Sequence, residues 1–480
     1  MYENGVDFNA FRAVLVGKAL MIHVIEKIYN IMIVFTVSSF DVTKEIDNRV
    51  YWKDLLAVLA VCLPFLTFGI ATTLLSLSTV GETIWNQTGL IIGAAVSGPV
   101  MCYVIDKCGR KIGIFIVYLV QGTTCIPLFL IPSTASVLTL HILTGISSGG
   151  LFTVLPIYLL ETFPTKIRAS ALALTTVMVS TGLLMKLAMS EEALMLAMVA
   201  LVMIEIMTLS IMVESPSYLV IVDKIEAAES AVAKLKYTTK DGPAVKHEVN
   251  MLKQESERAR ANGKITLYSF FKNRIWLDIT KIGIMLFTIK ELCGSIIFLD
   301  QDKTLLQLGL PSDPDRMLVV TAWCAGCIFC LVFVSFVERR YLLTFGYVVM
   351  VLSMGVLGVY TQADLTVKTL RWLPVAVLPI LVFGYGVTWG MPTIIMVEMY
   401  NLEIRATLIG VLYAYSEIVK LAHVHTFKYI EDYMGTYTVF YIFACVNLFA
   451  GVYALFAIPD IKNKSVRQIE RQLKRIPILK

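Results

Sequence analysis

The chain has 480 residues and a formal net charge of +5; 57% of its residues are hydrophobic and only 16% are charged. Its mean hydropathy of +0.74 and low charged fraction exclude an ordinary water-soluble globular domain, in which about a quarter of the residues are charged. The small basic excess gives no indication of nucleic-acid binding, because it lies in loops between apolar segments.

Residues 1–50 are interpreted as an N-terminal extension of unknown role. The apolar stretch at 29–40 is shorter than the roughly 20 residues that cross a bilayer core as a helix. An interfacial helix or a disordered extension is therefore favoured over a thirteenth span, and no small-residue cleavage site indicates a signal peptide.

Twelve apolar segments of membrane-spanning length follow, six on each side of a polar stretch at 214–274. They predict an all-α polytopic membrane protein with twelve transmembrane helices in two pseudo-symmetric six-helix bundles, at 51–213 and 275–458, and a tail at 459–480. The predicted spans are 55–77, 84–105, 112–132, 137–160, 169–189, 193–213, 277–299, 317–337, 341–361, 373–397, 406–428 and 435–458. Within the central stretch, residues 221–235 predict a surface helix with Ile225, Val232 and Leu235 on one side.

An internal repeat supports the two-bundle organisation. Residues 160–169 return as residues 397–406, with Glu161 matching Glu398 and Arg168 matching Arg405. Each copy ends a long apolar segment. Duplicated membrane bundles of this kind are typical of carriers that move two halves about a central site.

Basic residues alternate between loops, which predicts the orientation, because cytoplasmic loops hold an excess of Lys and Arg. The basic loops are those at 107–111, 166–168, 214–274, 339–340, 405 and 459–480. This pattern predicts that both termini and the central stretch of a multi-pass membrane protein are cytosolic. A location in the plasma membrane is a separate hypothesis, which this pattern does not supply. The sequon at Asn86 then falls at the outer end of the second span and is a candidate for glycosylation.

Cysteines occur in or beside the predicted spans, and Cys324, Cys327 and Cys330 recur every three residues along the eighth span. No His or acid shares this stripe. We therefore interpret it as close helix packing in preference to a soft-metal site, and the sequence predicts neither a metal site nor a cofactor.

Acids and bases recur at the span ends that face the basic loops, where they predict a cytosolic gate. Exposed ion pairs contribute about 0–1 kcal/mol each, which suits contacts that break in every transport cycle. The alternative is that the basic residues only anchor the helices, with solvated acids nearby. The gate residues are Asp106, Arg110, Lys111, Glu161, Arg168, Glu338, Arg339, Arg340, Glu398 and Arg405.

Four motifs stand in a fixed order along the chain. Residues 106–111 read DKCGRK, residues 156–168 fit P-x-Y-x-x-E-x-x-P-x-x-x-R, residues 214–219 read ESPSYL and residues 459–462 read PDIK. Over about residues 52–470 the chain resembles the sugar porter family of the major facilitator superfamily, most closely the facilitated trehalose transporters. The resemblance implies twelve helices in two bundles, helices in the central loop and a midplane substrate site served by alternating access. The second copy of the first motif is shortened to residues 338–340, which questions the symmetry of the gate.

The positions that the resemblance assigns to substrate contacts are changed in this sequence. Lys290 and Glu291 replace two amides, and Thr393 replaces a Trp, although Trp389 lies about one turn earlier. These changes remove amide and aromatic groups that recognise sugars. The candidate cavity residues are Lys290, Glu291, Ser295, Thr176, His141, Trp389, Thr393, Ser416, Glu417 and Lys420.

The resemblance gives no support for proton coupling. Proton-coupled members carry an acid after the Phe-Gly of the first span, where this chain has Ile70 and Ala71, and an Arg at the position of His141. A hydrogen-bonded packing role is favoured for His141 over a titrating one.

Charges within the predicted spans need partners or a wet cavity, since each costs about 2.5–3.5 kcal/mol in a bilayer core. Lys290 and Glu291 are adjacent and project about 100° apart, so mutual pairing is not expected. Glu417 and Lys420 lie three residues apart on one helix face. We expect cross-helix pairs Lys290–Glu417 and Glu291–Lys420 where the seventh and eleventh spans line one cavity. A site for a charged or zwitterionic solute and an internal ion-pair network that closes an unused cavity both remain open.

The leading hypothesis is facilitative transport of a small polar solute by alternating access, with a sugar such as trehalose or a hexose implied by the resemblance. The alternatives are a diverged carrier for a charged solute and a transport-incompetent sensor or scaffold. The expected partners are the solute and the lipid bilayer, with no nucleic acid and no obligate protein partner. An enzyme is not predicted, since no ATP-binding motif or nucleophile–base spacing occurs.

Overall fold

The computed structural model describes residues 52–77, 84–126, 134–261, 274–295, 313–363, 372–401, 404–462, 464 and 466–473. The predicted extension at 1–50 lies outside these residues. All regular elements in the described part of the chain are helices, and each of the twelve predicted spans overlaps at least one of them.

The N-terminal half supplies six spanning segments, and the C-terminal half supplies six more. The first set is α2 (Trp52–Leu77), α3 (Ile84–Cys108), α4 (Arg110–Thr123), α6 (Thr134–Thr162), α7 (Thr165–Leu184), extended by the 3-10 turn η2 (Met185–Leu187), and α8 (Glu191–Ile211). The second set is α13 (Arg274–Leu292), α16 (Asp313–Phe333), α17 (Arg339–Gln362), α18 (Trp372–Thr388) with α19 (Met391–Met399), α20 (Arg405–Met434) and α21 (Thr436–Ala457). A final helix, α22, covers Val466–Leu473.

The predicted tenth span is two helices, α18 and α19, separated by Trp389 and Gly390. Pro392 in the first turn of α19 has no N–H with which to continue the α18 hydrogen-bond ladder. A Cβ atom at Gly390 would lie 2.4 Å from Cγ2 of Thr176 on α7. Glycine therefore allows the break to lie directly against the N-terminal half.

Eight helical segments of the described residues, counting α18 and α19 together, are long and apolar enough to cross a membrane. The other four predicted spans fall short for two reasons. The described part of α4 has 14 residues, and the apolar part of α16 is limited to Met317–Phe333. Helices α13 and α20 instead carry charged residues along their length, which is expected of helices that line a polar cavity.

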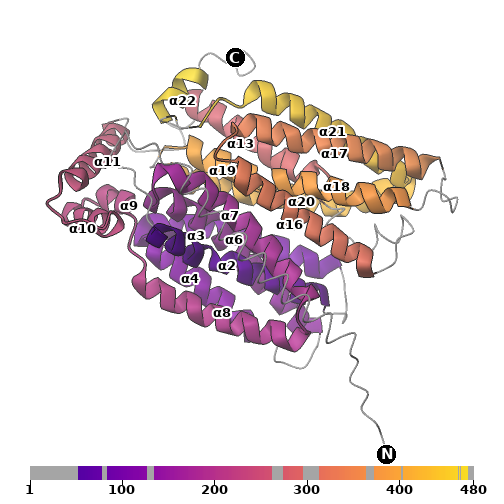
Figure 1. Ribbon diagram of the computed structural model, residues 1–480, viewed down its shortest axis with the longest axis horizontal. Helices are drawn as coiled ribbons and strands as arrows, with labels where there is room; N and C mark the ends of the chain where they lie inside the picture. Colours follow the sequence, from indigo (N-terminus) through magenta and orange to yellow (C-terminus); the bar gives the residue numbers. More distant parts are fainter. Residues whose placement is uncertain are drawn as a thin grey trace, which may run out of the picture.

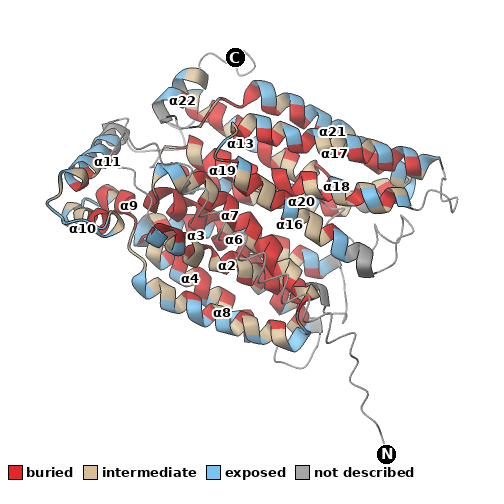
Figure 2. Ribbon diagram, viewed as in Figure 1, coloured by how far each residue is buried: buried red, intermediate tan, exposed pale blue. Residues whose placement is uncertain are grey.

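The two halves meet through related pairs of helices. Helix α3 packs on α20, and α7 packs on α16. Each pair joins the second spanning segment of one half to the fifth of the other. This is the pattern expected when two similar halves are related by a pseudo-two-fold axis. Figure 1 shows the halves side by side, and Figure 2 shows buried residues concentrated where they face each other.

Close helix packing inside the N-terminal half depends on glycine. A Cβ atom at Gly145 of α6 would lie 2.1 Å from the carbonyl oxygen of Leu90 on α3. Small residues of this kind let membrane helices approach closely. In the C-terminal half, buried cysteines of α16 likewise lie where two helices pack closely. The Cys327 thiol is 3.6 Å from the Gly386 carbonyl oxygen of α18.

The central stretch folds into three helices, α9 (Pro216–Ile221), α10 (Ile225–Leu235) and α11 (Pro243–Ala261), which lie together at one end of the molecule (Figure 1). The predicted surface helix at 221–235 therefore begins at Ile225, four residues after its predicted start. Asp223 has a φ of 64°, which interrupts the helical backbone between α9 and α10. Val232 is buried in a small core and Ile225 packs against it, as predicted, but the core is completed by alanines of α10 and valines of α11 and does not include Leu235.

Candidate functional site

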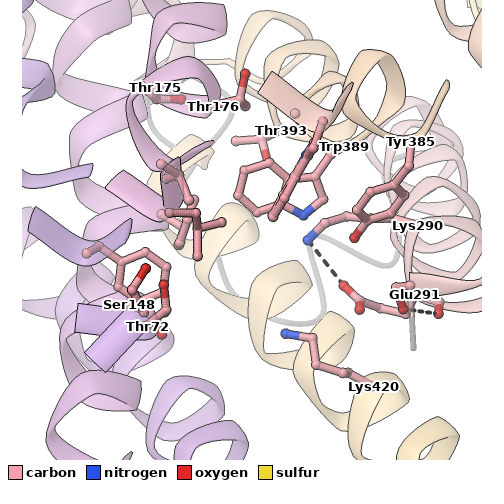
Figure 3. Close-up of a pocket in the computed structure, with 18 of the residues that line it drawn as sticks. Thr72, Ser148, Thr175, Thr176, Lys290, Glu291, Tyr385, Trp389, Thr393 and Lys420 are labelled. Atoms are coloured by element: carbon pink, nitrogen blue, oxygen red, sulfur yellow. Dashed lines mark hydrogen bonds and ion pairs between the residues drawn. The ribbon is translucent and has the colours of Figure 1, made fainter. Parts of the chain in front are cut away.

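A cavity of about 720 Å³ lies between the two halves. Hydroxyl-bearing residues of α2, α6 and α7 form one side, and residues of α13, α16, α18, α19 and α20 form the other. Figure 3 shows Thr72, Ser148 and Thr176 facing Lys290 and Trp389 across this space. The volume is in the range of small-molecule binding sites.

The cavity brings together eight of the ten candidate residues from the sequence. Those in its lining are Thr176, Lys290, Glu291, Ser295, Trp389, Thr393, Glu417 and Lys420. Ser416 lies behind the lining, fully buried, and donates a hydrogen bond to Glu291. His141 is not in the lining; its Nδ1 lies 2.8 Å from the Val137 carbonyl oxygen of the same helix, as the packing interpretation expects.

The ion pairs of the cavity differ from the predicted set. Lys290 Nζ lies 3.1 Å from Glu291 Oε1, so the expectation that these neighbours would not pair is wrong. The long, flexible lysine side chain folds across the angle between the two Cβ atoms. Lys420 Nζ lies 2.8 Å from Glu417 Oε2 on the same helix, as their spacing of three residues allows.

The predicted cross-helix ion pairs, Lys290–Glu417 and Glu291–Lys420, do not form among the described residues. A hydroxyl makes the link instead: Ser416 Oγ of α20 donates to Glu291 Oε1 of α13 over 2.6 Å. Each carboxylate is thus neutralised by a lysine of its own helix, and a neutral donor ties the two helices together.

An aromatic cluster lies between the halves, and most of its residues were not predicted from the sequence. Phe152 of α6 lies 5.8 Å from Trp389 and 6.2 Å from Tyr413, measured between ring centroids. Trp323 lies 5.5 Å from Trp389, edge to face. Trp389, which lies about one turn before the changed position Thr393, lines the cavity together with Trp323 of α16, so aromatic surface is present there. No local pattern marks these residues, since aromatic side chains are common in apolar spans.

The gate residues lie at the end of the bundle that carries α9–α11, which we call the basic end. There Arg110 makes a bidentate pair with Glu161: Nε donates over 2.9 Å and Nη2 over 3.1 Å. Ser215 Oγ also donates to Glu161, over 2.5 Å. Glu214 accepts the backbone N–H groups of Arg110 and Lys111. The start of α4 is thereby fixed to α6 and to the chain entering α9.

Tyr218 of α9 packs against this network. The Arg110 guanidinium lies 5.1 Å from its ring centroid, and its hydroxyl donates to the Lys107 carbonyl oxygen over 3.0 Å. Burial, together with nearby Glu214, raises the pKa of Tyr218, so this hydroxyl stays a neutral donor at physiological pH. The central helices therefore bond directly to the gate.

The C-terminal half repeats the arrangement despite its shortened motif. Arg339 Nη2 lies 3.0 Å from Glu398 Oε1, and its Nη1 donates to the Val334 carbonyl oxygen. Arg110 Nη1 donates in the same way to the carbonyl oxygen of Ile105, five residues before it. The repeat is only partial, because Arg339 Nε and Glu398 Oε2 have no hydrogen-bond partner among the described residues and this pair is therefore not bidentate. Glu338 and Arg340 form an ion pair over 2.6 Å, and both side chains are only partly buried.

Three contacts between described residues join the halves at the basic end, and one of them is a hydrogen bond between Ser170 Oγ of α7 and Ser335 Oγ over 2.7 Å. Arg405 Nη1 of α20 lies 3.7 Å from Glu161 Oε1 of α6, and Thr407 Oγ1 lies 3.5 Å from Asp106 Oδ2. Arg168 donates to the Phe163 carbonyl oxygen, as Arg405 does to that of Tyr400, five residues back in each case.

The pairs within each half, Arg110–Glu161 and Arg339–Glu398, are largely buried, contrary to the expectation of exposed pairs. The Arg110 and Glu161 side chains are 2% and 1% exposed. Breaking such a pair by removing one partner costs several kcal/mol. Arg110–Glu161 and Arg339–Glu398 are therefore suited to hold each half together, whereas the 3.7 Å contact of Arg405 with Glu161 joins the two halves.

The glycosylation candidate Asn86 lies in the first turn of α3, and its side chain is 4% exposed. A buried asparagine in a helix is poorly placed to accept a glycan, which is added to surface loops.

A helical membrane body of two related halves, with a cavity between them that is closed at one end, defines a secondary transporter. The chain matches the sequence model of the family described as "Sugar (and other) transporter" over residues 56–473, and it belongs to that family. Its twelve-helix major facilitator fold is thereby confirmed.

Curated relatives and solved structures agree with this assignment. The "Probable metabolite transport protein CsbC" of Bacillus subtilis (strain 168) is 25% identical over 406 residues, 81% of this chain and 84% of the relative. The "Facilitated trehalose transporter Tret1" of Apis mellifera ligustica is 23% identical over 457 residues, 88% of each chain. The structure of the proton:xylose symporter XylE bound to 6-bromo-6-deoxy-D-glucose superposes with a TM-score of 0.72 at 16% identity, covering 87% of this chain and 98% of that one.

Proposed function

We propose that this protein is a facilitative carrier that moves a small sugar, such as a hexose or trehalose, across the plasma membrane by alternating access. The observation that carries the proposal is the 720 Å³ cavity, lined by both halves, above a gate in which Glu161 and Arg405 join those halves. The sugar transporters among its relatives support the substrate class.

The cavity offers the two kinds of contact that a sugar needs. Trp389 and Trp323 present aromatic surface to the apolar face of a sugar ring. Hydroxyls of Thr72, Ser148 and Thr176 line the opposite side, and the Lys290–Glu291 pair offers a donor and an acceptor across the cavity from them. Hydrogen bonds to ionised groups are roughly twice as strong as neutral ones, so these charges replace the amides that the family resemblance led us to expect.

The gate supplies the conformational step. In this structure the basic end is closed and the cavity extends past Thr72 to Gln87 and Lys186 near the opposite helix ends. Release of the solute on the basic side requires the Glu161–Arg405 and Asp106–Thr407 contacts to break, while the buried pairs within each half persist. Rigid halves that exchange one set of contacts for another give alternating access.

The basic end faces the cytosol in this proposal, because it carries the basic loops and α9–α11. Both termini are then cytosolic. The functional units are two bundles at 51–213 and 275–458, the cytosolic helical segment at 214–274 and the tail at 459–480. Transport requires no catalysed reaction, no cofactor and no obligate protein partner.

Uptake by proteoliposomes tests the proposal. Purified full-length protein should give saturable uptake of labelled glucose or trehalose that stops at equal concentrations inside and outside. Trp389→Ala removes the aromatic surface and should raise the half-saturation concentration about tenfold, the equivalent of about 1.4 kcal/mol. Trp372→Ala is the matched control, since Trp372 is 61% exposed at the start of α18. Absence of flux for every sugar, or equal effects of the two variants, would overturn the proposal.

A further inference from the structure

The cavity carries more positive than negative charge. Its described lining contains three lysines, Lys186, Lys290 and Lys420, and two glutamates, Glu291 and Glu417. The three lysines against two glutamates leave one net positive charge. In a low-dielectric site such a charge attracts an anion far more strongly than it does in water.

The excess belongs to one residue. Glu291 pairs with Lys290 over 3.1 Å, and both oxygens of Glu417 accept from Lys420 over 2.8 Å. Both carboxylates are therefore already neutralised. Lys186 has no hydrogen bond or ion pair within the described residues, although it is half-buried and lines the cavity.

The local fold holds Lys186 at this place. It lies in the 3-10 turn η2, which follows the end of α7. Four residues earlier, Gly182 of α7 packs closely against Leu66 and Gly69 of α2, which fixes this end of the helix. Glu191 and Glu192 follow at the start of α8 but are exposed to solvent and form no ion pair with Lys186. The lysine therefore remains available to a bound solute.

We infer that the solute class of this carrier includes sugars bearing one carboxylate, such as hexuronates, and that Lys186 binds the carboxylate. This inference rests on the proposed function. The hydroxyls and the aromatic surface hold the body of the sugar, as they hold a neutral one. A single carboxylate matches the single unpaired cation, whereas a phosphate dianion would leave the occupied cavity negative.

Competition between labelled sugars in proteoliposomes at pH 7 tests the inference. Wild-type protein should take up glucuronate with a half-saturation concentration about tenfold below that of glucose. Lys186→Gln should abolish this preference while changing glucose uptake less than twofold, and Lys186→Arg should retain it. Lys234→Gln is the matched control, since Lys234 is exposed on α10, and it should leave both sugars unaffected.

A second readout separates charge binding from a structural role. Glucuronate should produce a transient current on a supported membrane, and glucose should not; Lys186→Gln should weaken only the former. Glucose uptake without glucuronate uptake, or better uptake of glucose 6-phosphate than of glucuronate, would overturn the inference and leave the proposed function standing. An equal loss of both sugars in Lys186→Gln would assign Lys186 a structural role. No flux of any sugar in the wild type would overturn the proposed function itself.

Discussion

Arg405→Gln should shift the carrier toward the state that is open at the basic end. The guanidinium lies 3.7 Å from the Glu161 carboxylate, and the two side chains are 8% and 1% exposed. At an effective dielectric of about 20, two unit charges at this distance attract by about 4.5 kcal/mol. Most of this is offset by desolvation, and Glu161 keeps its bidentate pair with Arg110, so we expect a net loss of about 1–2 kcal/mol from the closed state. The ratio of closed to open carrier should fall about 5–30-fold.

A pair of serines across the gate provides the assay. Ser170 Oγ of α7 lies 2.7 Å from Ser335 Oγ, just beyond the end of α16. Cysteines at these two positions should form a disulfide when the basic end is closed and react with a membrane-impermeant maleimide from the basic side when it is open. The ratio of the two rates reports the equilibrium.

The native exposed thiols, Cys108 and Cys445, are first replaced by serine to remove background reaction. Lys234→Gln, on the exposed face of α10, serves as the control with no expected shift. A ratio in Arg405→Gln that stays within twofold of the parent would refute the assignment of the Glu161–Arg405 contact to the closed state.

Three further predictions follow from packing and charge. Glu291→Gln leaves the partly buried Lys290 without its counter-ion and should lower the thermal unfolding midpoint more than the double variant Lys290→Gln/Glu291→Gln, measured on detergent-purified protein; the reverse order would show that an unpaired Lys290 is not what destabilises the protein. Gly145→Ala, whose Cβ would lie 2.1 Å from a carbonyl oxygen, should reduce the yield of folded protein, whereas Gly355→Ala, with nothing within 4 Å, should not; equal yields would contradict the described α3–α6 packing. Asn86→Gln should leave the electrophoretic mobility of protein expressed in eukaryotic cells unchanged, because Asn86 is buried in a helix; a faster-migrating variant would show that it is glycosylated.

Some parts of the site could be predicted from residues that are close in sequence. Glu417 and Lys420 are paired by helix geometry alone. The repeat also located both carboxylates of the gate, Glu161 and Glu398. The sequence could not show which arginine each would meet, because those partners come from helices that start about 50–60 residues away: Arg110 for one and Arg339 for the other.

The sequence by itself determined the class of fold. A bilayer core rewards any apolar helix of sufficient length, so the spans, their number and the duplication are recorded in local hydropathy and in a repeated decapeptide. Only the tertiary structure decided the contents of the cavity. Phe152 meets Trp389, and Lys186 shares a cavity with two neutralised glutamates while having no partner among the described residues, because helices remote in sequence pack there. Packing in three dimensions leaves no periodic signal along a chain of apolar residues.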